Sequence, residues 1–273
     1  LELAKKIAFK DKLESNLRIE LEKKVINDVN KIICASSHEK DIIDNYVAAS
    51  SKKVSIIPLA VDTNVFHPND QYLSREKLAI DQDCKIVLCV SRIDPVKGID
   101  ILVKSVAQLN NSQLKLMIIG GYNAPNPYQA KLLKLVKRLN LQEKIQFVGP
   151  VPHGDLVKYY NASDLVVVPS LYESFGLVSL EGFATKKPVI ASNIGGLAST
   201  IDNEVNGILF EPGNIKDLTQ KINLLLSDTF LNQKIANQAF MDVNKYSWDT
   251  AASQVYNVYA SLLTASKKIK VVS

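Results

Sequence analysis

Four charged side chains stand where they could act together on one anionic ligand. Arg92 and Lys97 follow one short apolar run, while Glu173 and Glu181 follow another and lie eight positions apart. A guanidinium, an ammonium and the free amides of a helix N-terminus all attract phosphate oxygens, which suits a diphosphate. A carboxylate can accept two hydroxyl groups, which suits a vicinal diol. An arbitrary pair of cations at this spacing is usually a solvated turn, so the chemistry depends on the elements that position it.

Apolar runs and helical patterns alternate along the chain from residue 85 onward. We expect strands at residues 86–90, 114–119, 144–148, 165–169, 189–191 and 207–210. Helical patterns lie at residues 98–110, 127–140, 154–162, 176–187, 197–203, 214–227, 229–243 and 248–265. This alternation predicts an α/β fold with a Rossmann-like, doubly wound parallel sheet. Ligands bind at the carboxyl ends of strands in such sheets, so both carboxylates should lie at that edge.

The first part of the chain has a different pattern. Residues 1–30 form a charge-rich helical pattern, strands are expected at 31–35 and 54–59, and Ser36 or Ser37 can cap a helix over 38–48. Two strands are too few for an independent sheet domain. We therefore expect an exposed apolar surface in this part of the molecule.

The segment YESFGLVSLE, residues 172–181, carries a family resemblance. Together with the following PVIAS and Gly195-Gly196, it resembles the E-x7-E signature of the retaining family 4 glycosyltransferases, which have the GT-B fold of two facing Rossmann-like domains. It is especially similar to D-inositol-3-phosphate glycosyltransferases and sucrose-phosphate-synthase-like enzymes. The resemblance extends over residues 84–212, where several separate blocks agree in order.

The resemblance implies a role for each of the four charged residues. Arg92 and Lys97 match the pair that holds the donor's phosphates, Glu181 matches the glutamate that binds the ribose hydroxyls, and Glu173 matches the one facing the donor sugar. Catalysis would then rest on Glu173, Arg92 and Lys97. The structural alternatives are a surface helix residue for Glu181 and a loop carboxylate near a helix N-terminus for Glu173.

Main-chain groups complete the implied nucleotide site. They belong to Gly120, Val148, Phe175, Gly176 and Leu177. The segment around Val148 would hold the base, which says little about uridine versus guanosine. Phe175 could instead be a core residue, and Gly120 could equally serve only to turn the chain.

Metal-binding patterns are weak. Asp81 and Asp83 form a D-x-D, but they precede a strand, so we interpret them as a turn at the wrong edge of the sheet. His38, His67 and His153 lack a partner at metal-ligand spacing; we expect His38 in a helix cap and His153 near the base. We therefore expect neither a metal nor another cofactor, because Arg92 and Lys97 would neutralise the leaving diphosphate.

Composition sets the broad class. The 273 residues are 47% hydrophobic and 22% charged, with a net charge of +5. No apolar run reaches the roughly 18 residues of a membrane span, and the first residues lack a signal-peptide core. We expect a cytoplasmic protein, with peripheral contact at the inner face of the cell membrane compatible with its charge. The basic residues are dispersed and no aromatic platform is visible, so nucleic acid is not an expected partner.

The resemblance also divides the chain. Residues 1–75 would be a remnant of the N-terminal acceptor domain and the linker, 76–246 the nucleotide-sugar-binding domain, and 247–273 a crossover helix and tail. Most of the N-terminal domain would be absent. We therefore expect the chain alone to bind nucleotide but to transfer sugar poorly or not at all.

The predicted function is transfer of a hexosyl unit from a nucleoside diphosphate sugar, UDP-linked in the family's most frequent case, with retention of configuration. The acceptor is left open as a sugar, a polyol phosphate or a lipid-linked glycan. Two alternatives belong to other functional classes. One is a phosphorylase or epimerase built on the same type of sheet, and the other is an inactive or accessory nucleotide-sugar-binding module.

Overall fold

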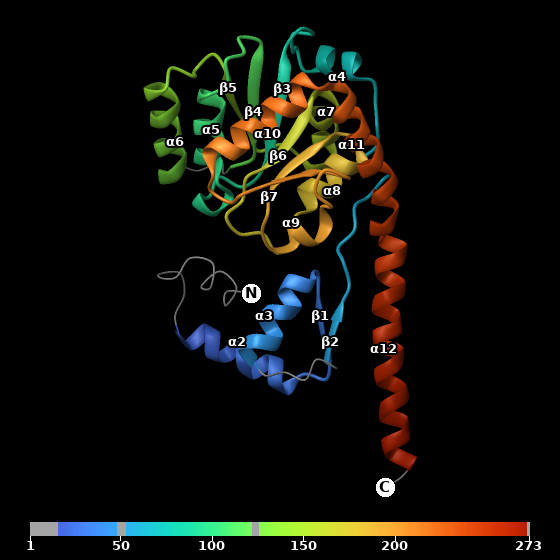
Figure 1. The fold of residues 1–273 in the computed structure, drawn as a ribbon. Coiled ribbons are helices and arrows are strands. Elements are labelled where there is room, and N and C mark those ends of the chain that lie inside the picture. Colours follow the sequence, from blue (N-terminus) through green and yellow to red (C-terminus); the bar gives the residue numbers. More distant parts are fainter. Residues whose placement is uncertain (1–15, 48–52, 122–125, 272–273) are drawn as a thin grey trace.

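The computed structural model describes residues 16–47, 53–121 and 126–271. A six-stranded parallel sheet with helices on both faces forms the larger unit (Figure 1). The smaller unit contains two parallel strands and two helices, and the long C-terminal helix extends beyond the sheet towards it. The α/β fold with a doubly wound parallel sheet is thus confirmed.

The large sheet has the order β5-β4-β3-β6-β7-β8. Its strands are β3 (Lys85–Val90), β4 (Leu114–Ile119), β5 (Ile145–Gly149), β6 (Leu165–Val168), β7 (Val189–Ser192) and β8 (Ile208–Phe210). The chain leaves β3 towards β4 on one side, whereas it leaves β6 towards β7 on the other side. The strand order therefore reverses between β3 and β6, and a crevice outside their carboxyl ends is where such sheets bind ligands.

Helices cover both faces of this sheet. They are α4 (Gln71–Lys77), α5 (Ile99–Ala107), α6 (Pro127–Arg138), α7 (Leu156–Ala162), α8 (Leu177–Ala184), α9 (Gly195–Thr200), α10 (Ile215–Ser227) and α11 (Thr229–Asp242). Helices α5, α6 and α10 pack on one face, and α7, α8 and α9 pack on the other.

Alternation along the strands explains the two layers. In β3, Val87 and Cys89 join the core under α5, while Ile86 and Leu88 join the core under α7 and α8. Successive strand side chains point to opposite faces, so a strand buried on both faces is a continuous apolar run. This is why KIVLCV reads as an uninterrupted hydrophobic segment.

Helix α4 was not predicted from the sequence. Asp70 caps it by accepting a hydrogen bond from the Leu73 amide, and Arg75 anchors it through an ion pair to Asp164 at 2.8 Å. The predicted domain boundary after residue 75 falls inside this helix. Because α4 is fixed to the sheet, we place the boundary before it.

The smaller unit consists of α2 (Asn16–Asp28), β1 (Ile32–Cys34), α3 (Ser37–Val47) and β2 (Val54–Ile56). The predicted helix over 1–30 is seen from residue 16; its first half lies outside the described residues. Leu17, Leu21 and Val25, spaced four residues apart, are exposed on α2. Ile33 and Ile56 are also exposed, so the predicted apolar surface is confirmed.

The remaining helix is α12 (Trp248–Val271), which follows the 3-10 helix η4 (Val243–Tyr246). It is longer than the predicted 248–265. Elsewhere the predicted elements are present, with their ends shifted by a few residues. Over the described part of the chain, no helix combines the length and apolarity needed to cross a bilayer.

Candidate active site

Two neighbouring loops meet where the strand order reverses. One follows β3 and carries Arg92 and Lys97; the other follows β6 and carries Glu173. The amide of Leu171 donates to the Val96 carbonyl at 2.7 Å, which joins the loops. Gly98 has a φ of 62°, and a Cβ atom there would lie 2.0 Å from the Pro169 carbonyl oxygen. Only glycine lets the two loops approach this closely.

Lys97 and Glu173 contact each other directly. The ammonium lies 2.6 Å from Glu173 Oε2, and the side chains are only 16% and 19% exposed. Lys97 ends the short 3-10 helix η2 (Pro95–Lys97), which Asp94 caps by accepting from the Val96 amide. The predicted phosphate-binding cation and the predicted sugar-facing acid are therefore brought together at one edge of the sheet. Arg92 lies five residues earlier in the same loop and is exposed.

Glu181 is buried and held at both carboxylate oxygens. The hydroxyl of Tyr160, on α7, donates to Oε2 at 2.5 Å, and Nε2 of His153 donates to Oε1 at 2.9 Å. Burial and the adjacent carboxylate raise the pKa of Tyr160 well above its ordinary value. The surface-residue alternative for Glu181 is thereby excluded, because the side chain points into a hydrogen-bonded pocket.

Tyr160 and His153 also share an aromatic support. Phe66 packs edge-on against both rings, with centroid distances of 5.8 Å to Tyr160 and 4.9 Å to His153. We expected His153 only near the base, and no sequence pattern points to Tyr160. Tyr160 lies in an ordinary amphipathic helix pattern, so only its register relative to α8 reveals the contact.

The start of α8 offers unpaired main-chain donors. Gly176 is its N-cap with a φ of 96°, and no side chain caps the first turn. The amides at the start of a helix are therefore left for solvent or a ligand. The Phe175 side chain is buried and packs on Tyr246, so its core alternative is correct and only its main chain can face a ligand. Leu177 is exposed.

Gly195 and Gly196, at the start of α9, pack against the main chain of the Glu173 loop. The Gly196 amide donates to the Glu173 carbonyl at 3.0 Å, and a Cβ atom at Gly196 would lie 2.1 Å from the Ser174 carbonyl oxygen. Both glycines belong to the first turn of α9, so they pack against this loop and support it.

Gly120 packs against the start of the loop that carries Arg92 and Lys97, whereas Val148 lies farther along the sheet. Gly120 has a φ of 120°, and its Cβ position lies 2.1 Å from the Ser91 carbonyl oxygen, so close packing accounts for this glycine. Val148 is half-buried in β5, which is separated from β3 by β4. The structure does not bring Val148 to the acid–cation pair.

A cavity borders the Glu173 loop on the side of the smaller unit. It has a volume of about 640 Å³ and is lined by α3, α9 and the loop after β6, including His38, Tyr172 and Ser199. The Ser36 hydroxyl donates to the Ser174 carbonyl at 3.0 Å, so the units meet here. Ser36 also caps α3 by accepting from the Glu39 amide, whereas His38 lines the cavity instead of capping.

The predicted turn at the D-x-D is confirmed. The amide of Asp83 donates to Asp81 Oδ1 at 2.9 Å, and the turn precedes β3 at the amino edge of the sheet. Within the described ranges, no three His, Cys, Asp or Glu side chains form a group that could hold a metal ion.

Comparison with known proteins identifies the family. The model of the family "Glycosyl transferases group 1" matches residues 70–241, more than half of the chain. The chain belongs to this glycosyltransferase family. The sheet and its helices match the GT-B structures of that family: sucrose-phosphate synthase from Thermosynechococcus elongatus aligns with a TM-score of 0.86 and 31% identity, over 92% of this chain and 63% of that one.

Two further proteins are similar to this chain, one in sequence and one in structure. The D-inositol 3-phosphate glycosyltransferase of Corynebacterium aurimucosum is 29% identical over 262 residues. This alignment covers 93% of the chain but 62% of the relative, so the chain spans less than two thirds of that protein. Anabaena Alr3699/HepE, whose structure contains UDP-glucose, aligns with a TM-score of 0.84 and 25% identity, over 91% of this chain and 68% of that one.

Proposed function

We propose that this chain provides the donor site of an enzyme that transfers a hexosyl unit from a nucleoside diphosphate sugar, UDP-linked, with retention of configuration. The observation that carries the proposal is the Lys97–Glu173 contact at the reversal point of the sheet, beside the uncapped start of α8. Alr3699/HepE, which holds UDP-glucose, supports a UDP-linked donor.

Each charged residue then has a separate task. Lys97, Arg92 and the first amides of α8 bind the diphosphate, because they place positive charge and N–H donors at one edge. Glu181 accepts the ribose hydroxyls, and Tyr160 keeps its carboxylate in position. His153 is 68% exposed and moves aside when ribose takes its place.

The reaction breaks the bond between C1 of the sugar and the diphosphate oxygen. Negative charge grows on the leaving diphosphate, which Lys97 and Arg92 stabilise, while positive charge grows at C1. The acceptor hydroxyl attacks C1 from the face that the diphosphate leaves and passes its proton to a diphosphate oxygen. Glu173, paired with Lys97, orients the sugar hydroxyls. The reaction forms no covalent bond between the sugar and the enzyme.

We propose that this step needs no metal ion. Two cations already face the diphosphate, so they supply the electrostatic stabilisation that a divalent cation gives elsewhere. Nucleotide binding should therefore be the same in EDTA and in Mg²⁺ when compared by calorimetry.

The acceptor is a sugar, a polyol phosphate or a lipid-linked glycan, and we propose that it enters from the side of the cavity between α3 and α9. We further propose that the chain as it stands binds nucleotide but transfers sugar slowly. The exposed apolar residues of α2 and β1 support this, because nothing in the described part of the chain covers them on that side of the smaller unit.

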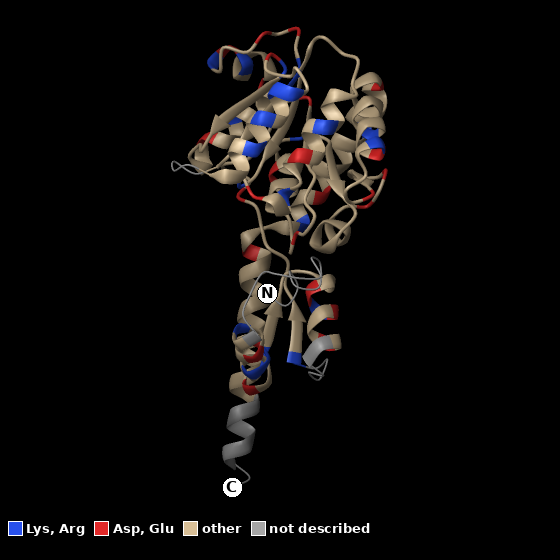
Figure 2. Cartoon of the chain, turned by 90° about the vertical axis from the view of Figure 1, so that its left-hand side faces the viewer, with Lys and Arg blue, Asp and Glu red and all other residues tan. Residues whose placement is uncertain are grey.

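Helix α6 supports a peripheral membrane contact. Its exposed face carries Lys131, Lys134, Lys137 and Arg138 with the exposed Leu133, and the helix contains no acidic residue. Figure 2 looks at the side on which α6 lies and shows its basic residues following one another. Each cation near an anionic bilayer contributes about 1 kcal/mol. We propose that α6 rests on anionic lipid at the inner face of the cell membrane.

Vesicle sedimentation tests this contact. The chain should sediment with vesicles containing phosphatidylglycerol but not with pure phosphatidylcholine vesicles, and the Gln variant of the four α6 cations should stay in solution. Equal binding of wild type and variant, or a preference for RNA over anionic vesicles, would refute it.

Calorimetry with UDP, GDP and ADP tests the central proposal. We expect one nucleotide to bind, and Glu181→Ala and Lys97→Met to weaken it. The product of a full reaction, followed by mass spectrometry, then separates slow from efficient transfer. Binding of no nucleotide would favour a different role, while tight binding without transfer under any acceptor would favour an accessory nucleotide-sugar-binding module.

A further inference from the structure

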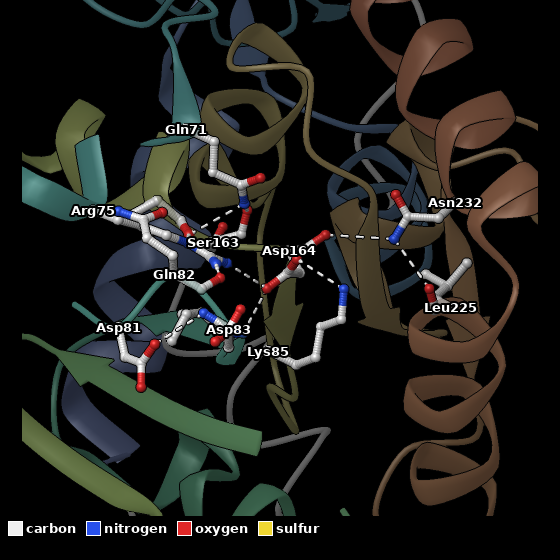
Figure 3. Close-up of polar contacts among 12 residues, drawn as sticks. Gln71, Arg75, Asp81, Gln82, Asp83, Lys85, Ser163, Asp164, Leu225 and Asn232 are labelled. Atoms are coloured by element: carbon white, nitrogen blue, oxygen red, sulfur yellow. Dashed lines mark hydrogen bonds and ion pairs between the residues drawn. The ribbon is translucent and has the colours of Figure 1, made fainter. Parts of the chain in front are cut away.

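A cavity of about 480 Å³ opens at the amino ends of β3, β6 and β7, on the opposite edge from the candidate active site. It lies between the sheet, α4 and α11. Figure 3 shows Asp164 at its centre, with Arg75 and Lys85 directed towards it and Asn232 reaching in from α11. Nothing in the proposed transfer reaction uses this cavity.

Positive charge dominates the lining. Lys85, Lys186 and Lys187 line the cavity, and Asp164 is the acidic residue among the described residues that face it. Asp164 is already engaged, because Oδ2 accepts from Arg75 at 2.8 Å and from the Ile86 amide at 2.6 Å. Lys85 approaches the other oxygen no closer than 3.8 Å. The cavity lining therefore contains three lysines and a single carboxylate, and that carboxylate is paired with Arg75.

Two of these lysines occupy unfavourable environments. Burial lowers the pKa of Lys187 from 10.5 to about 8, an effect that Asp164 only partly opposes. Lys186 has a φ of 57°, in the left-handed region that favours glycine. A lysine at such a backbone position costs about 1 kcal/mol. Charged side chains held at an energetic cost next to a cavity are typical of a binding site.

The lining selects among anions. The guanidinium of Arg75, which would pair with a carboxylate in fork fashion, is used up by the Ala162 carbonyl, the Gln82 carbonyl and Asp164. Ammonium groups act as point charges and bind phosphate well. Amide side chains of Gln233 and Asn237 offer donors for hydroxyl groups on the rest of the ligand, whereas the Asn232 amide already donates to the Leu225 and Asp164 carbonyls. The volume lies in the usual range of roughly 300–1,000 Å³ for small-molecule sites.

We propose that this cavity binds a small soluble phosphate monoester, with its phosphate on Lys85, Lys186 and Lys187. The site lies at the amino edge of the sheet, so it is distinct from the diphosphate site at the carboxyl edge. It does not depend on the proposed function, and its ligand can be present together with the nucleotide.

Calorimetry on the full chain tests the proposal with inorganic phosphate, glucose 6-phosphate and citrate as probes. We expect glucose 6-phosphate to bind more tightly than inorganic phosphate, and citrate to bind weakest. The K85Q/K186Q/K187Q variant should lose at least tenfold in affinity for glucose 6-phosphate. The matched variant K131Q/K134Q/K137Q removes three exposed lysines of α6 and should bind like the wild type, as should Lys97→Met.

Two further measurements guard against an unfolded variant. Asn237→Asp adds one negative charge to the lining at almost unchanged shape and should weaken glucose 6-phosphate binding about fivefold. At pH 8.5, binding should take up a proton, because a phosphate next to Lys187 raises its pKa; titrations in buffers of different ionisation enthalpy measure this uptake. The proposal is wrong if no phosphate probe binds at millimolar concentration, if Lys97→Met abolishes binding, or if the α6 variant loses as much affinity as the cavity variant.

Discussion

The two edges of the large sheet differ in how far their charged side chains neutralise one another. At the carboxyl edge, Lys97 is paired with Glu173, and Glu181 is held by Tyr160 and His153. At the amino edge, three lysines line one cavity with a carboxylate that Arg75 already neutralises. At the carboxyl edge the charged side chains are thus held in position and paired, whereas the amino edge carries an excess of positive charge.

This difference affects how each edge can bind a ligand. At the carboxyl edge, a diphosphate must share Lys97 with Glu173, so binding exchanges one charged contact for another and orients the sugar at the same time. At the amino edge, an anion relieves a repulsion already present in the free protein. The first arrangement couples binding to the orientation of the ligand, whereas the second attracts an anion through an excess of positive charge.

The largest effect should come from breaking the loop contact that builds the carboxyl edge. Gly98→Ala places a methyl group 2.0 Å from the Pro169 carbonyl oxygen at a φ of 62°. We expect the free energy of unfolding to fall by about 3 kcal/mol or more, since neither backbone can give way cheaply. Urea denaturation measures it. Gly154→Ala, whose Cβ position has no neighbour within 4 Å, is the control and should change stability little. Equal stability of the two variants would contradict this account of the edge.

Removing the cation of the carboxyl edge should have the next largest effect. Lys97→Met keeps the length of the side chain but leaves Glu173 unpaired beside the diphosphate. We expect UDP affinity to fall about a hundredfold, or ~2.7 kcal/mol, because a charged contact is replaced by a repulsion. Calorimetry with UDP measures the change. Lys104→Met, which breaks the ion pair with Asp100 on α5, should leave UDP affinity unchanged.

The amino edge should show its excess charge in the pH dependence of stability. The pKa of Lys187 is about 8 in the folded protein and 10.5 in an exposed chain, so the folded state binds this proton less tightly. Stability should therefore rise with pH from about 8 to 10.5, at up to ~1.4 kcal/mol per pH unit from this residue. Lys187→Met should lose this rise and be more stable than wild type at pH 7, where the wild-type lysine carries its charge at the full cost of burial.

Denaturation at several pH values, with Lys186→Met as the exposed neighbouring control, measures this. A Lys187→Met profile parallel to that of the wild type would show that Lys187 is not strained by burial. The cavity would then lose one of the observations that distinguish its charge from that of an ordinary surface.

Sequence reasoning was most successful where the signal is local. Uninterrupted apolar runs such as 86–90 define strands buried on both faces, and the strand–helix alternation gives the sheet. Helix α4 was missed because its apolar content is low and its anchor, Arg75–Asp164, joins residues far apart in the chain. Which edge a residue occupies follows from its position after or before a strand, so Lys97 and Glu173 could be placed together.

Contacts between helices could not be predicted in this way. Tyr160 and Glu181 meet because α7 and α8 pack on one face in one register, and neither pattern contains that register. The amino-edge cavity is likewise assembled from Lys85, Lys187 and α11, which are distant in sequence. Its only local signal is a Lys-Lys pair before a proline, which resembles any solvated turn.

The smallest expected effect tests the part that sequence reasoning missed. Tyr160→Phe leaves Oε2 of the buried Glu181 without its donor, so we expect a loss of about 1 kcal/mol in stability and about fivefold in UDP affinity. Tyr159→Phe, the neighbouring tyrosine, should change UDP affinity little. The pKa of Tyr160 is raised in the folded state, so its contribution is complete below pH 10 and is lost as pH rises towards the folded value. The stability difference between wild type and Tyr160→Phe should therefore shrink above pH 10. If Tyr160→Phe lowered stability but left UDP affinity unchanged, Tyr160 would be a packing residue, and the ordering of Glu181 at the carboxyl edge would depend on His153 instead.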